Sequence, residues 1–155
     1  RGGLLSVKGP NIMMGYLNHQ GTITPPSGII GLGWYDTGDI IEINSDGYIT
    51  ILGRAKRFAK IGGEMVSLAS IEQTVAARWP EGEHAAENTF DQEKGEQVVL
   101  VTTNEEVSRV GIASAMKDAG KPNLMVPKRV VLIKEIPYLG TGKINHAAIK
   151  KKILI

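Results

Sequence analysis

The first third of the chain consists of short apolar stretches broken by turn-forming residues. Residues 39–43 and 48–52 are rich in isoleucine with polar residues between, and they flank residues 44–47, Asn-Ser-Asp-Gly. An Asp-Gly pair accepts positive φ, so this arrangement predicts a β-hairpin. Proline and glycine at residues 24–28 mark a loop. We therefore expect the chain up to Leu52 to be β-rich and irregular.

The pattern changes after Gly53. Residues 58–66 predict a small hairpin that turns at Gly62-Gly63. Ser67 is a candidate N-cap, because its hydroxyl can accept a hydrogen bond from the first turn of the helix that follows. That helix is expected to end at Pro80. Its apolar face, at helical spacing, consists of Leu68, Ile71 and Val75.

Further along, apolar stretches alternate with amphipathic segments. Strands are expected at residues 84–90, 96–103 and 129–133. Helices are expected at residues 108–119, with Gly120 as the C-terminal cap, and at residues 145–152, capped by Asn145. The inward residues of the first of these helices are expected to be Ile112, Ala115, Met116 and Ala119. Three strands with covering helices predict a small α+β domain.

These patterns predict an α+β protein with two domains. Residues 1–54 form the β-rich part, and residues 55–155 form a small domain with a three-stranded sheet flanked by helices. The chain starts at Arg1 rather than methionine, directly in a strand-like stretch, so we expect it to be a piece of a longer polypeptide. Any site in it would then be part of a larger site.

Composition excludes several classes of protein. The net charge of +2 and the aromatic content of 5% argue against a nucleic-acid partner, which would need a basic surface or a stacking platform. The chain has no cysteine, so disulfides and thiolate chemistry are excluded, and a reducing compartment such as the cytoplasm is expected. No apolar run approaches the roughly 18 residues of a membrane-spanning helix.

Asp39 and Arg54 are candidates for nucleotide binding. An ionised carboxylate only accepts hydrogen bonds, so Asp39 could take both hydroxyls of a ribose. Arg54, directly after Gly53, offers a planar fork suited to ribose or phosphate oxygens. Each also has an ordinary interpretation, Asp39 as a turn acid and Arg54 as half of a surface ion pair.

Lys143 is the candidate catalytic residue. Gly140 and Gly142 flank Thr141 in front of it, and such a loop could carry the ammonium to a phosphate or acyl carboxylate. The pattern is not a phosphate-binding Walker loop, because Pro137 and Ile144 stand where glycine and Ser/Thr are needed. The alternative is a solvated loop lysine.

Two other groups of residues have weaker signals. Gly62-Gly63-Glu64 could let a thin ligand arm pass close to the backbone, or could form only a turn. The three histidines lack the spacing of metal ligands, so no metal site is expected in this chain. They are His19, His84 and His146.

Four motifs in order resemble those of the adenylate-forming superfamily, which includes acyl-CoA synthetases, luciferases and peptide-synthetase adenylation domains. Residues 7–18 resemble the segment before the nucleotide motifs, and residues 35–39, Tyr-Asp-Thr-Gly-Asp, resemble the ribose motif. Residues 53–72 resemble the hinge and thioester-loop motif, and residues 137–143 the closing motif. Asp36 departs from the pattern, since a basic or aromatic residue is more usual there.

The resemblance implies a role for each matching residue. Asp39 would bind the ribose of ATP, with help from Arg54, Thr37 and Tyr35, and Lys143 would stabilise the adenylation transition state. The implied fold is the β-rich end of a large adenylation domain followed by a mobile lid. The implied cofactors are ATP, Mg²⁺ with ligands outside this chain, and the phosphopantetheine thiol of a carrier.

The resemblance also implies a second half-reaction with a different set of residues. Lys56 would be the hinge about which the lid rotates; many relatives have aspartate there. The residues implied to face the phosphopantetheine arm or its carrier are Gly62, Gly63, Glu64, Arg57 and Lys60.

Within the superfamily, the chain most resembles bacterial acyl-acyl-carrier-protein synthetases that also acylate lysophospholipids. Residues 53–61, 63–68 and 94–96 carry this likeness. It implies a fatty acid substrate, acyl carrier protein as partner, and a parent protein at the cytoplasmic face of the bacterial inner membrane. The phosphate loop and the magnesium-binding glutamate of the family are missing, so the chain alone is expected to be inactive without its N-terminal adenylation domain.

Two alternatives stay open at this point. A CoA-dependent or amino-acid-activating relative would carry the same motifs, because the acyl pocket lies upstream of them. A non-catalytic binding module, built from a β-rich segment and a small α+β domain, would need neither ATP nor Lys143.

Overall fold

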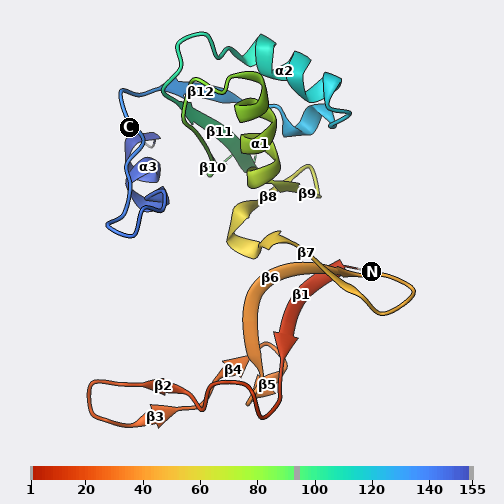
Figure 1. Ribbon diagram of the computed structural model, residues 1–155, viewed down its shortest axis with the longest axis vertical. Coiled ribbons are helices and arrows are strands. Elements are labelled where there is room, and N and C mark those ends of the chain that lie inside the picture. Colours follow the sequence, from red (N-terminus) through yellow and green to blue (C-terminus); the bar gives the residue numbers. More distant parts are fainter. Residues whose placement is uncertain (1, 93–94, 154–155) are drawn as a thin grey trace. The chain divides into compact units, whose positions relative to one another are not determined.

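The computed structural model describes residues 2–92 and 95–153, and the chain divides into two compact units, Arg1–Lys56 and Arg57–Ile155. Figure 1 shows the elements of both units. Among the described residues, the first unit contains strands and the start of a 3₁₀ turn, whereas the second has three α-helices, a three-stranded sheet and a two-stranded hairpin. The predicted α+β class is confirmed. No helix in the described part of the chain has the length and apolar character needed to cross a membrane.

Unit 1 is built on an antiparallel sheet in the order β1-β6-β7, formed by Gly2–Val7, Tyr35–Ile43 and Ile49–Arg54. The predicted hairpin is the β6–β7 connection. Asn44 Oδ1 accepts hydrogen bonds from the amides of Asp46 and Tyr48, and Gly47 has φ of +84°. The asparagine and the glycine therefore close the turn.

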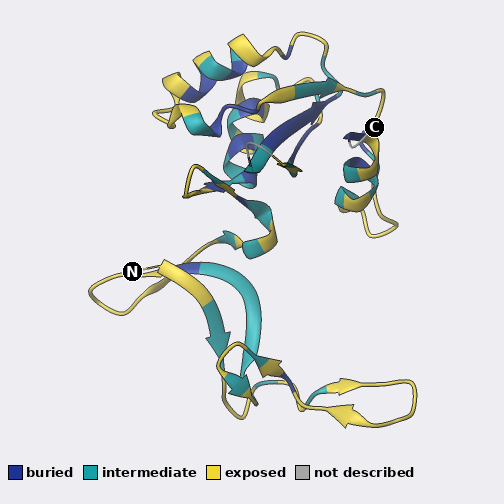
Figure 2. Ribbon diagram, turned by 180° about the vertical axis from the view of Figure 1, so that it is seen from behind, coloured by how far each residue is buried: buried dark blue, intermediate teal, exposed yellow. Residues whose placement is uncertain are grey.

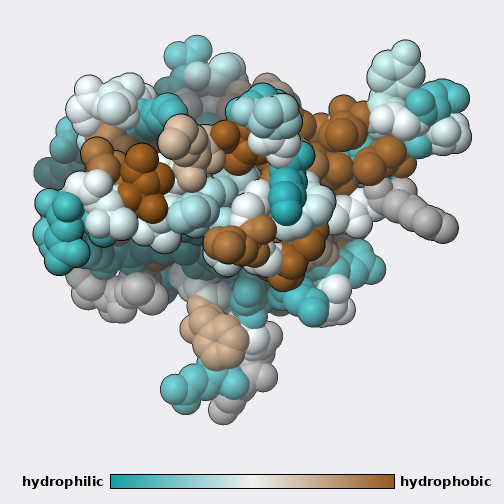
Figure 3. Space-filling view, turned by 90° about the horizontal axis from the view of Figure 1, so that it is seen from below, coloured by the Kyte–Doolittle hydropathy of each residue, from teal (hydrophilic) through white to brown (hydrophobic). Residues whose placement is uncertain are grey.

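Two short hairpins complete unit 1. One pairs β2 (Tyr16–Leu17) with β3 (Ile23–Thr24), and the other pairs β4 (Ser27–Gly28) with β5 (Gly31–Leu32). Most of the unit is exposed or half-buried, as Figure 2 shows. The face in Figure 3 carries several apolar side chains. Exposed large apolar residues of unit 1 include Met14, Leu17, Ile29, Ile30, Leu32 and Ile51.

The 3₁₀ turn η1 (Ala55–Arg57) spans the boundary, and its last residue, Arg57, is the first residue of unit 2. A hairpin of β8 (Phe58–Ile61) and β9 (Glu64–Ser67) follows. Gly62 and Gly63 both have positive φ, which explains why the predicted turn has two glycines. Helix α1 (Leu68–Arg78) follows, and Ser67 Oγ accepts a hydrogen bond from the Ser70 amide as the predicted N-cap.

The sheet of unit 2 has the order β10-β11-β12. Strand β10 (His84–Asp91) pairs antiparallel with β11 (Gly95–Thr102), which pairs parallel with β12 (Arg129–Leu132). Residue Lys94, part of the likeness to acyl-carrier-protein synthetases, lies outside the described residues. Among the described residues no strand pairs with the outer side of β10, so the backbone groups of this edge must be satisfied by side chains or solvent.

Side chains alternate across this sheet, so each face has its own core. Helices α1 and α2 (Arg109–Asp118) cover one face, packing with Ala86, Val98 and Leu100. Helix α3 (His146–Ile153) and the segment before it cover the other face, which carries Ala85, Val99 and Val101. Figure 1 shows the helices on opposite sides of the sheet.

Both later helices begin where the sequence predicts. Ser108 Oγ accepts from the Gly111 amide, and Asn145 Oδ1 accepts from the Ala148 amide. One expected core residue is wrong: Ala119 is exposed, because α2 ends at Asp118 and the chain turns away at Gly120, whose φ is +65°. The 3₁₀ turn η2 (Asn123–Met125) then leads to β12.

Candidate functional site

Asp39 and Arg54 meet across the β6–β7 pair, where they are register partners. Arg54 Nε lies 3.1 Å from Asp39 Oδ1, and Arg54 Nη1 donates to the carbonyl oxygen of Thr37 over 2.7 Å. The Asp39 side chain is 19% exposed and that of Arg54 is 66% exposed. The guanidinium therefore holds the carboxylate from its solvent side while part of the arginine remains free to contact a ligand.

Thr37 and Tyr35, also predicted to bind the nucleotide, lie on the same strand. Thr37 Oγ1 donates to the Leu5 carbonyl and accepts from the Asp39 amide, both over 3.1 Å. Gly38, between Thr37 and Asp39, has φ of +76°. Tyr35 is half-buried and pairs with Val7. The Thr37 hydroxyl thus shapes the backbone that presents Asp39, and direct ligand binding by Thr37 and Tyr35 remains a prediction.

Asp36, the departure from the ribose motif, has a structural role. Its Oδ1 accepts from Ser6 Oγ over 2.6 Å, and its Oδ2 accepts from the Ile29 amide over 2.9 Å. A Cβ on Gly28 would lie 2.4 Å from Asp36 Oδ1. The carboxylate fastens the β4–β5 hairpin to the main sheet of unit 1.

Lys143 is exposed on a closed loop between the isolated bridge partners Tyr138 and Ile144. The Leu139 amide donates to the Lys143 carbonyl over 2.8 Å, and the Gly142 amide donates to the Leu139 carbonyl over 2.9 Å. The backbone is therefore ordered by its own turn, while the ammonium extends into solvent. Lys143 belongs to unit 2, whereas Asp39 and Arg54 belong to unit 1.

Tyr138 anchors the N-terminal side of this loop. Its hydroxyl donates to Glu83 Oε1 over 2.5 Å. The hydrogen bond to Glu83 raises the pKa of Tyr138 above 10.0, and desolvation and the negative charge of Glu83 raise it further. Glu83 directly precedes β10, so the contact ties the Lys143 loop to the sheet.

The residues predicted for the second half-reaction lie at the start of unit 2, except Lys56, which is the last residue of unit 1. Lys56 is exposed in η1, and Lys60, Gly62, Gly63 and Glu64 are exposed on the β8–β9 hairpin. The Lys60 amide donates to Glu96 Oε2 over 2.7 Å, which joins the hairpin to β11. The glycine turn is open: a Cβ on either glycine would meet nothing within 4 Å.

Arg57 faces inward, although it is predicted to face the carrier. Its guanidinium contacts Glu72 over 2.6 Å, the Ala86 carbonyl over 3.0 Å and His146 Nδ1 over 3.3 Å. Its side chain is 19% exposed. The carrier-facing role of Arg57 therefore remains a prediction, and the contacts that the structure gives it lie within unit 2.

The sequence did not single out the ionic cluster that Arg57 joins. Glu87, almost fully buried on β10, contacts Arg57, His146 and Lys150. Glu87, His146 and Lys150 all lie 30 or more positions after Arg57, so no local spacing marks them. Glu72 on α1 is nearer, 15 positions after Arg57. The strand around Glu87 also contains His84, Asn88, Thr89 and Asp91, so its composition does not mark the glutamate either.

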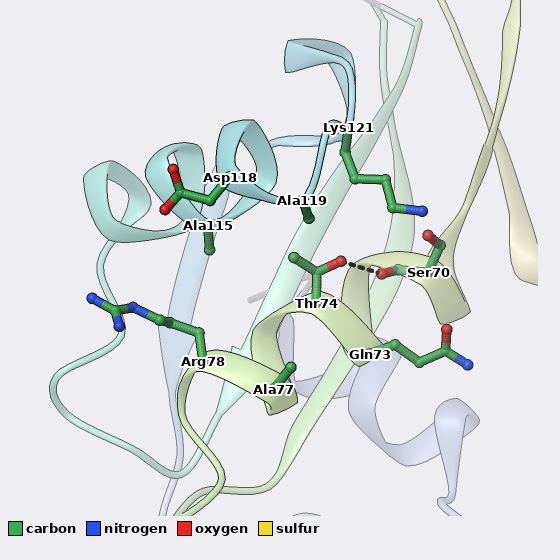
Figure 4. Close-up of a pocket in the computed structure, with 9 residues that line it drawn as sticks. All are labelled: Ser70, Gln73, Thr74, Ala77, Arg78, Ala115, Asp118, Ala119 and Lys121. Carbon is green, nitrogen blue, oxygen red and sulfur yellow. Dashed lines mark hydrogen bonds between the residues drawn. The ribbon is translucent and has the colours of Figure 1, made fainter.

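A groove of about 490 Å³ lies between α1 and α2. Figure 4 shows its lining, with Arg78 and Lys121 at the rim and the Thr74 hydroxyl bonded to the Ser70 carbonyl. None of the predicted site residues lines it. Within the described ranges, no group of three or more acidic or histidine side chains is placed to hold a metal ion.

The chain is similar to curated enzymes that activate carboxylic acids. It is 28% identical over 153 residues to a 2,3-dihydroxybenzoate-AMP ligase of Bacillus subtilis, covering 97% of this chain and 28% of the relative. It is 30% identical over 131 residues to a medium-chain-fatty-acid–CoA ligase of Ectopseudomonas oleovorans, covering 82% of this chain and 24% of the relative. This chain belongs to the adenylate-forming superfamily. No protein-family model matches it.

A solved structure supports the superfamily assignment. ATP-bound MatB from Rhodopseudomonas palustris superposes with a TM-score of 0.73 and 25% identity, covering 98% of this chain and 30% of that one. The adenylate-forming chain thus spans less than a third of the relatives that it matches. The α+β fold of unit 2 matches the C-terminal domain of adenylate-forming enzymes.

Proposed function

We propose that the chain is the C-terminal part of an ATP-dependent ligase that activates a carboxylic acid and transfers its acyl group to a thiol. The observation that carries the proposal is the Asp39–Arg54 pair, an acceptor-only carboxylate held 3.1 Å from an arginine fork that remains two-thirds exposed. Such a pair can accept hydrogen bonds from ribose hydroxyls and donate to a phosphate or ribose oxygen. The relatives named CoA and AMP ligases support this chemistry.

In the first half-reaction a carboxylate oxygen of the acid attacks the α-phosphorus of ATP. A P–O bond forms to the acid, the P–O bond to pyrophosphate breaks, and acyl-adenylate results. Asp39 and Arg54 hold the nucleotide, and Lys143 stabilises the negative charge that grows on the phosphate and acyl oxygens. The exposure of Lys143 and the ordered turn beneath it support a lysine that enters a closed site from a lid.

In the second half-reaction a thiol sulfur attacks the acyl carbonyl carbon. A C–S bond forms, the C–O bond to AMP breaks, and the thiol proton passes to solvent. Lys56 is the hinge of the lid in this proposal, and the open Gly62-Gly63 turn lets the pantetheine arm of the thiol pass close to the backbone. The division of the chain into units next to Lys56 supports a hinge there.

We propose a fatty acid as substrate and acyl carrier protein as the thiol carrier, with CoA as the alternative. The exposed Lys56 and Lys60 support an acidic carrier, because opposite charges steer association. The E. oleovorans relative, named a medium-chain-fatty-acid–CoA ligase, supports CoA equally well. Acylation of a lysophospholipid by the parent protein, and its place at the inner membrane, remain predictions.

We also propose that the rest of the large domain covers the apolar surface of unit 1. Among the described residues of unit 1 only Pro26 and Ile41 are buried, while Leu17, Ile29, Ile30 and Leu32 are exposed. Burial of these side chains would supply stability that the unit lacks alone. The 155-residue chain is therefore expected to form no acyl-adenylate by itself.

The experiment uses the complete polypeptide that carries this chain. Exchange of labelled pyrophosphate into ATP is measured with a series of fatty acids and aromatic acids, and thioester formation is then measured with CoA or acyl carrier protein. The proposal expects acid-dependent exchange and one preferred thiol. Absence of exchange with every acid would refute the proposed ligase activity. A preference for CoA would refute only the proposal that acyl carrier protein is the thiol partner.

A further inference from the structure

A buried carboxylate that the proposed reaction does not use lies at the centre of the ionic cluster in unit 2. The Glu87 side chain is 2% exposed. His146 Nδ1 lies 2.5 Å from its Oε1, Arg57 Nη1 lies 3.8 Å from the same oxygen, and Lys150 Nζ lies 3.9 Å from its Oε2. A buried carboxylate is costly unless it is paired, so these partners are what allow it to stay in the strand.

Arg57 fixes the start of unit 2 to the edge of the sheet. The Ala86 carbonyl accepts from Arg57 Nη1 over 3.0 Å, and the Ala86 amide donates to Glu72 Oε1 over 2.7 Å. Arg57 and Glu72 are themselves 2.6 Å apart. The pair therefore satisfies both free backbone groups of this edge residue. Arg57 directly follows Lys56, the proposed hinge.

His146 connects Glu87 to the segment that carries Lys143. It is the first residue of α3 and lies three positions after Lys143. A carboxylate only accepts, so His146 Nδ1 is the donor to Glu87. Asn145 lies between Lys143 and His146 in the sequence, and its amide donates to the Pro137 carbonyl over 2.8 Å, which closes the base of the Lys143 loop. The Lys143 loop is thus held at both ends: Tyr138, before it in the sequence, contacts Glu83, and His146, after it, contacts Glu87.

We propose that Glu87 is a positioning residue for Lys143, joining the loop of the catalytic lysine to the residue after the hinge through His146 and Arg57. The inference rests on the proposed role of Lys143. The lysine side chain is long and exposed, so the orientation of its loop relative to the hinge decides where the ammonium arrives when the lid closes. A small displacement of a catalytic group is enough to slow a reaction strongly.

The test measures the two half-reactions of the complete enzyme separately, for Glu87→Gln, His146→Ala and His146→Asn. We expect Glu87→Gln and His146→Ala to lower the kcat of adenylation by about 10- to 100-fold. The KM for ATP should change by less than about twofold, because ground-state binding is kept. Transfer from preformed acyl-adenylate to the thiol should keep its rate, because that step does not use Lys143.

The asparagine variant tests the contact itself. The side-chain amide of asparagine can donate from about the position of Nδ1, so His146→Asn should recover most of the adenylation rate lost in His146→Ala. His146 is 37% exposed, so its variants carry the test if Glu87→Gln does not fold. Glu105→Gln, at an exposed carboxylate before α2, is the matched control and should leave both half-reactions unchanged.

An equal fall in both half-reactions, or adenylation at the wild-type rate in both Glu87→Gln and His146→Ala, would overturn the positioning role. Lys143→Ala measured in parallel separates this failure from failure of the proposed function. If Lys143→Ala abolishes adenylation while the Glu87 and His146 variants are normal, only the positioning role is refuted. If Lys143→Ala adenylates normally, both proposals are refuted.

Discussion

Arg54 and Asp39 stand opposite each other on β7 and β6, with Nε 3.1 Å from Oδ1. The same guanidinium donates to the Thr37 carbonyl two residues before Asp39. One arginine thus orients both the carboxylate and the backbone turn that presents it. The pairing explains how a strand end can hold the acid that we propose as the nucleotide ligand in a single orientation.

Arg54→Leu should weaken binding of the nucleotide by the complete enzyme. Loss of one charge-assisted hydrogen-bonding group costs about 1.5–3 kcal/mol, which corresponds to roughly a 10- to 150-fold rise in the Kd for ATP. Isothermal titration calorimetry with ATP measures this Kd. Lys8→Leu, at an exposed lysine of the same unit, is the control. An Arg54→Leu enzyme that binds ATP as tightly as wild type would contradict the role of the pair.

Gly28→Ala should destabilise unit 1, because its Cβ would lie 2.4 Å from Asp36 Oδ1 and would break the contacts of that carboxylate. We expect a loss of about 1–3 kcal/mol in the free energy of unfolding, measured by denaturant titration. Gly3→Ala, on the main sheet of the same unit, has no atom within 4 Å of the new Cβ and serves as control. Equal stability of the two variants would show that Asp36 is free to move away.

Tyr138 should give the Lys143 loop a pH-dependent contact. Because the pKa of Tyr138 is raised in the folded protein, its contribution to stability is complete below the unfolded value of 10.0 and is lost as the pH rises through the higher folded value. Ultraviolet titration of tyrosinate should show one late-ionising tyrosine that is absent in Tyr138→Phe. Glu83→Gln should move this ionisation to lower pH. A titration unchanged by Glu83→Gln would contradict the contact.

Local chemistry explains which parts of the fold could be predicted from the sequence. The Asn44–Gly47 turn, the Gly62-Gly63 turn and the caps Ser67 and Asn145 depend on residues a few positions apart, and all are confirmed. The inward placement of Ala119 was wrong, because periodicity alone does not fix the last turn of a helix.

Long-range pairing explains which parts could not be predicted. Arg57 meets His146 across 89 residues, and Asp36 meets Ser6 across 30, so neither contact has a local spacing to reveal it. Asp36 looked like a departure from a ligand motif, but the fold uses it to hold a hairpin. Asp39 and Arg54 were each selected from the sequence as nucleotide-binding candidates, and the hairpin that they flank brings them together as register partners.

The most direct test of the account is the exchange of labelled pyrophosphate into ATP by the complete enzyme with Lys143→Ala. The account predicts a fall in kcat of about 10²- to 10³-fold, as for loss of one group that stabilises a developing charge, with an unchanged melting temperature. Lys151→Ala, at an exposed lysine of α3, should exchange at the wild-type rate. Exchange by Lys143→Ala within about twofold of wild type would contradict the central claim that this ammonium stabilises the adenylation transition state.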